Sequence, residues 1–137
     1  IPVLGFLIRS VGAFPVKRGT ADRTALRQAI ELLQSGKVVG MFPEGTRSLD
    51  GNLQEPEPGV GMIALKAGVP VIPMALINTN KLLPPHSFFL KFTRVKVIFG
   101  EPVRLDDLCE KPGREAVEEV GKRIMSAIGR LIEENKG

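Results

Sequence analysis

The sequence has 137 residues, of which 43% are hydrophobic and 25% charged, and its formal net charge is +4. This length and balance fit a globular protein with a real core and argue against disorder over most of the chain. The single cysteine excludes an internal disulfide and fits a reducing compartment. The sequence has no Trp or Tyr to stack on bases, which argues against single-stranded nucleic-acid binding. The positive charge favours anionic partners, although a well-solvated surface would explain it equally well.

The first part of the chain predicts a helix, a strand and a second helix. Residues 3–11 are expected to be the tail of a helix, and residues 13–18, AFPVKR, a short strand with a basic end. Residues 20–36 place apolar side chains at helical spacing, with Thr20 or Asp22 as the N-cap. The chain begins in an apolar run without a methionine. We therefore expect it to be a piece of a longer protein.

The middle of the chain predicts a buried strand, a loop, a helix and another strand. Residues 37–42, KVVGMF, form an apolar run bounded by Gly and Pro, as expected of a strand buried on both faces. A loop rich in Gly, Pro and Glu follows over 43–58, and a short buried helix over 59–68. Residues 69–77, VPVIPMALI, are the next expected strand, whose prolines indicate an end or an edge.

The last part of the chain predicts a half-exposed strand and a long helix. Residues 94–100 alternate apolar and basic side chains, and residues 113–135 carry an apolar face at helical spacing. The order of these elements is that of an α/β protein. We predict one domain, residues 1–137, with a mostly parallel mixed sheet flanked by helices.

Basic side chains follow two of the expected strands at the points where the strands end. Lys17 and Arg18 lie in PVKRG, and Arg47 lies in FPEGTRS, residues 42–48. Ligands of open α/β sheets bind beyond the carboxyl ends of strands. If the two strands are neighbours, these three cations converge, and guanidinium groups bind phosphate through paired hydrogen bonds. The pattern predicts an anion site.

The remaining residues of FPEGTRS fit the same interpretation. Gly45 allows backbone N–H groups to approach an anion closely, and Thr46 adds a hydroxyl donor. Glu44 cannot bind phosphate, but it can orient an arginine or accept hydrogen bonds from substrate hydroxyls. A loop in which Glu44 and Arg47 simply pair with each other is at least as compatible with the spacing.

Other candidate sites are weaker. GVGMIA, residues 59–64, matches a permissive dinucleotide pattern, but EPEP precedes it instead of a strand, so we reject a dinucleotide site. His86 is the single histidine and has no partners for a metal site, and Cys109 lies among acids that disfavour a reactive thiolate. The stretch 82–92 collects Phe and Leu and is either a membrane-touching loop or a loop folded onto the core.

The motif FPEGTRS, set between GKVVGM and DGNL, resembles the third conserved block of the glycerolipid acyltransferases, which include the 1-acylglycerol-3-phosphate (lysophosphatidate) acyltransferases of the PlsC type. VGAFPVKRG resembles the second block, whose arginine matches Arg18. PGVGMIALKAGVPVIPMAL resembles the stretch that ends in the fourth block, and IPVLGFLIRS the segment before the second. The resemblance runs from Ile1 to about Val103.

The sequence differs from the family in one respect, which concerns the family's first conserved block. It is an Asn-His followed after four residues by Asp, with the histidine as general base, and this sequence does not contain it. His86 does not replace it, because the residue five places on is Lys91. The resemblance therefore implies a partial acyltransferase domain without catalytic residues of its own, which we expect to be inactive alone.

The resemblance implies transfer of a fatty acyl group from acyl-CoA or acyl-carrier protein to lysophosphatidate in phospholipid synthesis. The residues that would bind the acceptor are Lys17, Arg18, Phe42, Glu44, Gly45, Thr46 and Arg47. No metal or bound cofactor is implied, and the expected partners are the acceptor, the acyl donor and a membrane surface, but not nucleic acid. The expected location is the cytoplasmic face of a membrane, peripheral or monotopic. The alternative is a relative that binds lysophospholipid or acidic membrane without turnover.

Overall fold

The computed structural model of the protein describes residues 10, 12–14, 16, 22–45, 52–82, 92–110 and 113–135. The chain divides into two compact units, Ile1–Val39 and Gly40–Gly137, and each is described by itself. The single domain expected over residues 1–137 stays a prediction. The helix expected over 3–11 lies outside the described residues except for Ser10, which is helical.

In the first unit, α2 spans Arg23–Gln34 and confirms the helix expected there. Asp22, one of the two predicted caps, is the N-cap, and its Oδ1 accepts hydrogen bonds from the backbone N–H groups of Thr24 and Ala25, both at 3.1 Å. These bonds satisfy two amides that would otherwise lack a helical partner. The small residues Ala25 and Ala29 are the buried residues of the helix.

The two strands expected before the FPEGTRS motif are not formed by the described residues. Residues 37–42 have no strand conformation, and Val38 and Phe42 are 96% and 70% exposed. In the strand expected over 13–18, the described residues 13, 14 and 16 are irregular. The prediction of a buried strand at 37–42 is therefore wrong for this structure. A strand forms only when its backbone N–H and C=O groups pair with those of a neighbouring strand, and no strand in the described part of the chain pairs with residues 37–42.

In the second unit, α3 spans Pro58–Ala67 and matches the expected short buried helix. Pro58 opens the first turn, where a missing N–H costs nothing, and Gly68 ends the helix with φ of +62°. Gly61 lies so close to the backbone carbonyl of Val117, in α6, that a Cβ at this position would overlap it. The glycine at position 61 of GVGMIA therefore serves close packing between helices.

The described sheet is a pair of antiparallel strands. β1 spans Met74–Ile77 and β2 spans Lys96–Phe99, with Met74 opposite Phe99 and Ile77 opposite Lys96. The expectation of strands within 69–77 and 94–100 is confirmed, but the mostly parallel sheet is wrong for the described residues. Alternation and apolar runs indicate that a strand forms, while its direction depends on which edges meet in the folded chain. The mixed α/β class stands.

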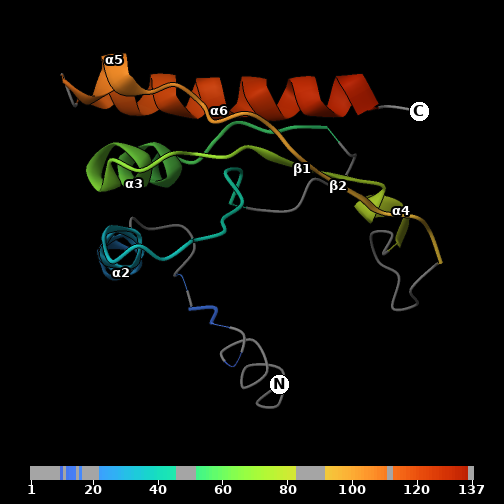
Figure 1. Ribbon diagram of the computed structural model, residues 1–137, viewed down its shortest axis with the longest axis horizontal. Helices are drawn as coiled ribbons and strands as arrows, with labels where there is room; N and C mark the ends of the chain where they lie inside the picture. The colour runs from blue at the N-terminus through green and yellow to red at the C-terminus, as the bar shows by residue number, and fades with distance from the viewer. Residues whose placement is uncertain are drawn as a thin grey trace. The chain divides into compact units, whose positions relative to one another are not determined.

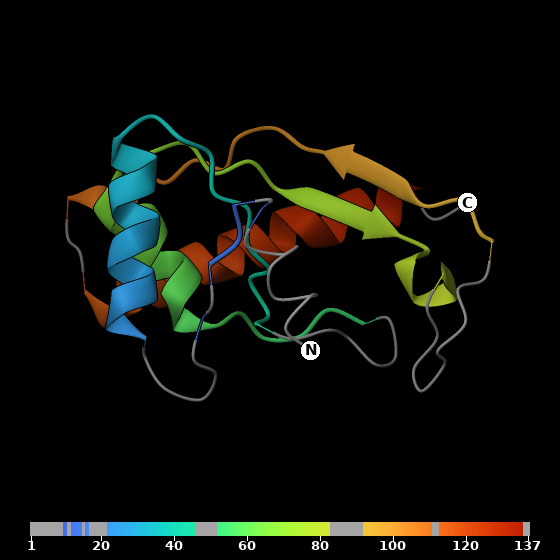
Figure 2. The same ribbon diagram turned by 90° about the horizontal axis from the view of Figure 1, so that it is seen from below.

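The long helix α6, Arg114–Asn135, forms the main packing surface of the second unit. Figures 1 and 2 show it running alongside α3 and the β1–β2 pair. Two short helices also occur among the described residues of the unit: α4, Thr79–Leu82, follows β1, and α5, Asp106–Cys109, precedes α6. The helix expected over 113–135 is thus confirmed.

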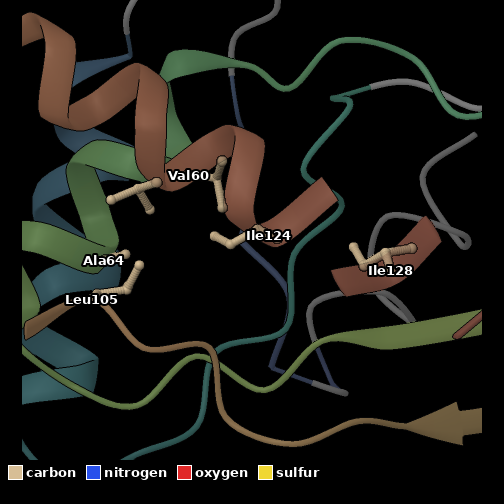
Figure 3. Close-up of a cluster of buried hydrophobic side chains, with 6 residues drawn as sticks. Val60, Ala64, Leu105, Ile124 and Ile128 are labelled. Carbon is tan, nitrogen blue, oxygen red and sulfur yellow. The ribbon is translucent and has the colours of Figure 1, made fainter. Parts of the chain in front are cut away.

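The core of the second unit lies where α3, α6 and the residue before α5 meet. Figure 3 shows Val60 and Ala64 of α3 in the same interior as Leu105 and Ile124. Val120 is fully buried, and it is the largest such side chain among the residues that the structure describes. Burying aliphatic side chains of this size stabilises by about 1.5–3 kcal/mol each.

Candidate functional site

The described part of the FPEGTRS motif is a tight turn. The backbone N–H of Gly45 donates to the carbonyl of Phe42 at 3.1 Å, which closes a four-residue turn. Pro43 occupies the second position, where its fixed φ is favourable, and Gly45 occupies the last. Gly45 has φ of +64°, a left-handed conformation that glycine adopts without steric cost. The loop expected from Pro43 onward is confirmed for residues 43–45, whereas Phe42, expected to end a strand, begins the turn.

A second segment, residues 54–57, lies against this turn, and we call it the strap. The backbone N–H of Gln54 donates to Oε2 of Glu44 at 2.8 Å. The backbone N–H of Glu57 donates to the carbonyl of Pro43 at 2.7 Å. A Cβ on Gly45 would lie 2.8 Å from Cγ of Glu57, so the Glu57 side chain also covers the turn. Two hydrogen bonds and one packing contact thus join the turn to the strap.

The strap is in turn seated on the core helices. A Cβ on Gly121 of α6 would lie 2.9 Å from Cγ of Pro56, so the proline ring sits directly on the helix at a position where a side chain is missing. Glu57 is also the N-cap residue of α3, so the strap runs straight into that helix. The position of the turn therefore depends on the packing of the second unit.

The structure places three of the seven predicted acceptor-binding residues, and it brings them together in one turn: Phe42, Glu44 and Gly45. Phe42 is mostly exposed, and Glu44 is half-buried. Lys17, Arg18, Thr46 and Arg47 lie outside the described residues. The convergence of Arg18 and Arg47 on one anion stays a prediction, as does pairing between Glu44 and Arg47.

Sequence reasoning misses the strap. Gln54 contributes only its backbone N–H, a group that nearly every residue has, so no side-chain pattern indicates this partner ten residues away. The prolines of EPEP, residues 55–58, are the available signal. They favour an extended or turning chain that leads into a helix at its first position.

A shallow groove of about 540 Å³ lies beside α6 and is lined largely by charged side chains. Arg123 at its edge donates to both carboxylate oxygens of Asp107 at 2.7 Å and to Glu119 at 3.0 Å. The hydrogen bonds from Arg123 lower the pKa of Asp107, and those to Asp107 and Glu119 raise the pKa of Arg123. Arg123, in α6, therefore links α6 to α5 through its bonds to Asp107.

Other kinds of site find no support among the described residues. No cluster of three or more His, Cys, Asp or Glu side chains able to hold a metal ion occurs in this part of the chain. None of the helices that the structure describes is both long and apolar enough to cross a bilayer. Cys109 is exposed at the end of α5, and His86 lies outside the described residues.

Comparison with known proteins defines the class. Residues 1–77 match the family described as Acyltransferase, and this match covers more than half of the 137 residues. It includes both PVKRG and the whole of FPEGTRS. The chain belongs to the acyltransferase family.

Relatives make the comparison more specific. The chain is 37% identical over 124 residues to 1-acyl-sn-glycerol-3-phosphate acyltransferase BAT2, chloroplastic, of Brassica napus, covering 86% of this chain and 36% of that protein. It is 30% identical over 134 residues to 1-acyl-sn-glycerol-3-phosphate acyltransferase of Bacillus subtilis (strain 168), covering 97% of this chain and 63% of that protein. The chain thus spans about a third of the length of the first relative and less than two thirds of the length of the second.

A solved structure shares the fold. The crystal structure of the 1-acyl-sn-glycerophosphate (LPA) acyltransferase PlsC from Thermotoga maritima aligns with a TM-score of 0.69 at 36% identity. The alignment covers 82% of this chain and 46% of that chain. The similarity therefore extends well beyond the motifs.

Proposed function

We propose that this chain is part of an enzyme that transfers a fatty acyl group to the free hydroxyl of 1-acylglycerol 3-phosphate, with acyl-CoA or acyl-carrier protein as donor. The observation that carries the proposal is the family match over residues 1–77, which contains both basic motifs. The names of the relatives support the phosphorylated acceptor. The braced turn at Phe42–Gly45 supports a fixed binding loop.

The role that we assign to these residues is positioning of the acceptor. Arg18 and Arg47, with Lys17, would bind the glycerol phosphate, since charge-assisted and paired hydrogen bonds suit a phosphate group. Phe42, Glu44, Gly45 and Thr46 would shape the surrounding loop. Fixing the hydroxyl in a reactive geometry contributes as much as about 7–11 kcal/mol to lowering a barrier.

The proton of the acceptor hydroxyl must go to a base as the oxygen attacks the thioester carbon. The C–S bond then breaks, and the thiolate of the donor leaves. We propose that this base is a histidine that is not among these residues, because the one histidine, His86, is outside the matched motifs. General-base catalysis of this kind contributes about 10²–10⁴-fold. No metal or bound cofactor enters the proposal.

We further propose that the enzyme works at the cytoplasmic face of a membrane as a peripheral or monotopic protein. The net charge of +4 supports attraction to an anionic lipid surface. The competing function is binding of lysophospholipid or acidic membrane without turnover. The same net charge supports it.

The test uses the full-length protein with lysophosphatidate and acyl-CoA or acyl-carrier protein varied separately. Replacing Arg47→Ala should raise the KM for the acceptor by about ten- to a hundredfold, since a hydrogen bond to a charged group contributes about 1.5–3 kcal/mol. The KM for the donor should stay the same. Arg114→Ala is the control, because this exposed arginine pairs with Glu118 on α6. Binding of lysophosphatidate without any turnover would favour the competing function, and an effect confined to the donor would refute the role of Arg47.

A further inference from the structure

We infer that Glu44 acts as a positioning residue: its carboxylate holds the Phe42–Gly45 turn on the strap, residues 54–57, and the strap fixes the turn to α6. The inference rests on the proposed function, because it explains how the acceptor loop is kept in place. It assigns to Glu44 a backbone partner within the chain in place of a contact with substrate.

An acidic side chain is out of place at a phosphate site. A carboxylate a few ångströms from a phosphate repels it, and it also competes for the arginines that should bind it. The hydrogen bond of 2.8 Å from the Gln54 N–H to Glu44 Oε2 supplies a reason for the acid. A carboxylate accepts from a backbone N–H more strongly than a neutral oxygen does.

Glu44 lies within the turn at a position where this bond holds the second half of the turn. Glu44 is the third residue of the turn, and the chain runs directly from Gly45 into Thr46 and Arg47. One side of the turn is held at Pro43 by Glu57, and the other at Glu44 by Gln54. Losing the second bond leaves Pro43 as the one hydrogen-bonded attachment of the turn to the strap, beside the packing contact of Gly45 with Glu57, so we expect the turn to be held less firmly.

The strap is anchored to both core helices. Pro56 packs on Gly121 of α6, and Glu57 occupies the N-cap position of α3, which itself packs closely on α6 at Gly61. Pro56 also restricts the preceding residue to an extended conformation. Loop residues that must meet a ligand within a fraction of an ångström need such a supporting layer.

The first experiment compares Glu44→Ala with Glu44→Gln in the full-length protein. The amide of Gln keeps a carbonyl oxygen that can accept from Gln54 N–H but lacks the charge. We expect Glu44→Ala to raise the KM for lysophosphatidate about tenfold with kcat within about twofold, and Glu44→Gln to restore most of the loss. Equal loss in both variants would overturn the inference, because it would mean that the negative charge itself is required.

The second experiment approaches the same bond from its donor. Gln54→Pro removes the N–H, whereas Gln54→Ala removes only the side chain and keeps the N–H. We expect the proline variant to reproduce the KM effect of Glu44→Ala and the alanine variant to resemble the wild type. The Glu44→Ala/Gln54→Pro double variant should be no worse than either single variant, since both remove one interaction. Additive effects would contradict the shared bond.

A third measurement separates this inference from the proposed function. Amide hydrogen exchange at Gln54 should be faster in Glu44→Ala than in wild type and unchanged in Glu55→Ala, which removes the neighbouring acid. Unchanged exchange in Glu44→Ala would overturn the inference directly. If exchange is faster in Glu44→Ala but the wild-type protein shows no acyl transfer with any donor, the hydrogen bond between Gln54 and Glu44 is supported and the proposed function is refuted. Thermal unfolding of each variant identifies any loss of fold.

Discussion

The α3–α6 core and the Phe42–Gly45 turn lie in the same unit but are held by different forces. The core is aliphatic, and its buried cluster joins α3 to α6 through side chains and through a glycine at the crossing. The turn is held by three backbone N–H donors, with Phe42 left mostly exposed. Apolar packing tolerates little change in volume, while a hydrogen-bonded turn depends on a few directed contacts. The core should therefore govern stability, and the turn should govern binding.

The largest effect is expected in the core. Ile124 is 3% exposed, so Ile124→Ala should lower the free energy of unfolding by about 2–5 kcal/mol through lost burial and the cavity that remains. Ile72→Ala is the matched control, because Ile72 is 49% exposed and its loss should cost far less. Urea denaturation of both variants measures the difference. Equal losses would show that the core assignment is wrong.

The helix crossing tests how tightly the core is packed. Gly61→Ala should lower the free energy of unfolding by about 1–3 kcal/mol, because its methyl group would overlap the backbone carbonyl of Val117. Gly113→Ala is the control, because a methyl group there meets no neighbouring atom, and its cost should be limited to the smaller preference of the N-cap position for glycine over alanine. The same denaturation experiment applies. A stabilised Gly61→Ala variant would mean that α3 and α6 can move apart at no cost, and the contrast with the turn would then weaken.

The turn itself is tested by two glycines with nearly equal conformations. Gly45 and Gly68 have φ of +64° and +62°, so replacement by alanine strains the backbone similarly at both. Gly45→Ala alone also meets Glu57, with Cγ 2.8 Å away, whereas Gly68 has open space. We expect Gly45→Ala to cost on the order of 1 kcal/mol more than Gly68→Ala. Equal costs would indicate that the strap moves aside freely.

The smallest effect is expected at the α5–α6 ion pair. Arg123 lowers the pKa of Asp107, so the native state binds this proton less tightly than the unfolded state does. The pair therefore stabilises the fold at pH values above the ordinary carboxyl pKa, and this contribution disappears as pH falls through the lowered pKa. Asp107→Asn should slightly lower the melting temperature at neutral pH and leave it unchanged in strong acid.

The control for the ion pair is Asp106→Asn, since Asp106 makes no ion pair within the described part of the chain. This variant should melt like the wild type at both pH values. A difference between Asp107→Asn and wild type that persists in strong acid would show that the effect does not come from the charge of Asp107. Exposed ion pairs contribute little to stability in general, so we expect this change in melting temperature to be the smallest of the four effects.

Local patterns are sufficient for α2, α3 and α6, but they do not predict the short helices α4 and α5. The apolar spacing within 113–135 and 20–36 follows from helical geometry, and Asp22 is one of two predicted caps because a short acidic side chain can bond the first free amides. The strand at 37–42 is predicted from an apolar run alone. That prediction fails for the described residues because a strand must pair with a neighbouring strand. Whether a neighbour is present depends on the tertiary structure and not on the local sequence.

The sequence by itself determined the family, through two basic motifs in order, and a loop from Pro43 onward, through its Gly, Pro and Glu residues. The tertiary structure decided that β1 and β2 run antiparallel, and that Glu44 bonds the Gln54 N–H. Side-chain chemistry is written in the sequence, but backbone N–H and C=O groups are nearly the same in every residue. Which of them meet across many residues of chain is decided only when the core packs.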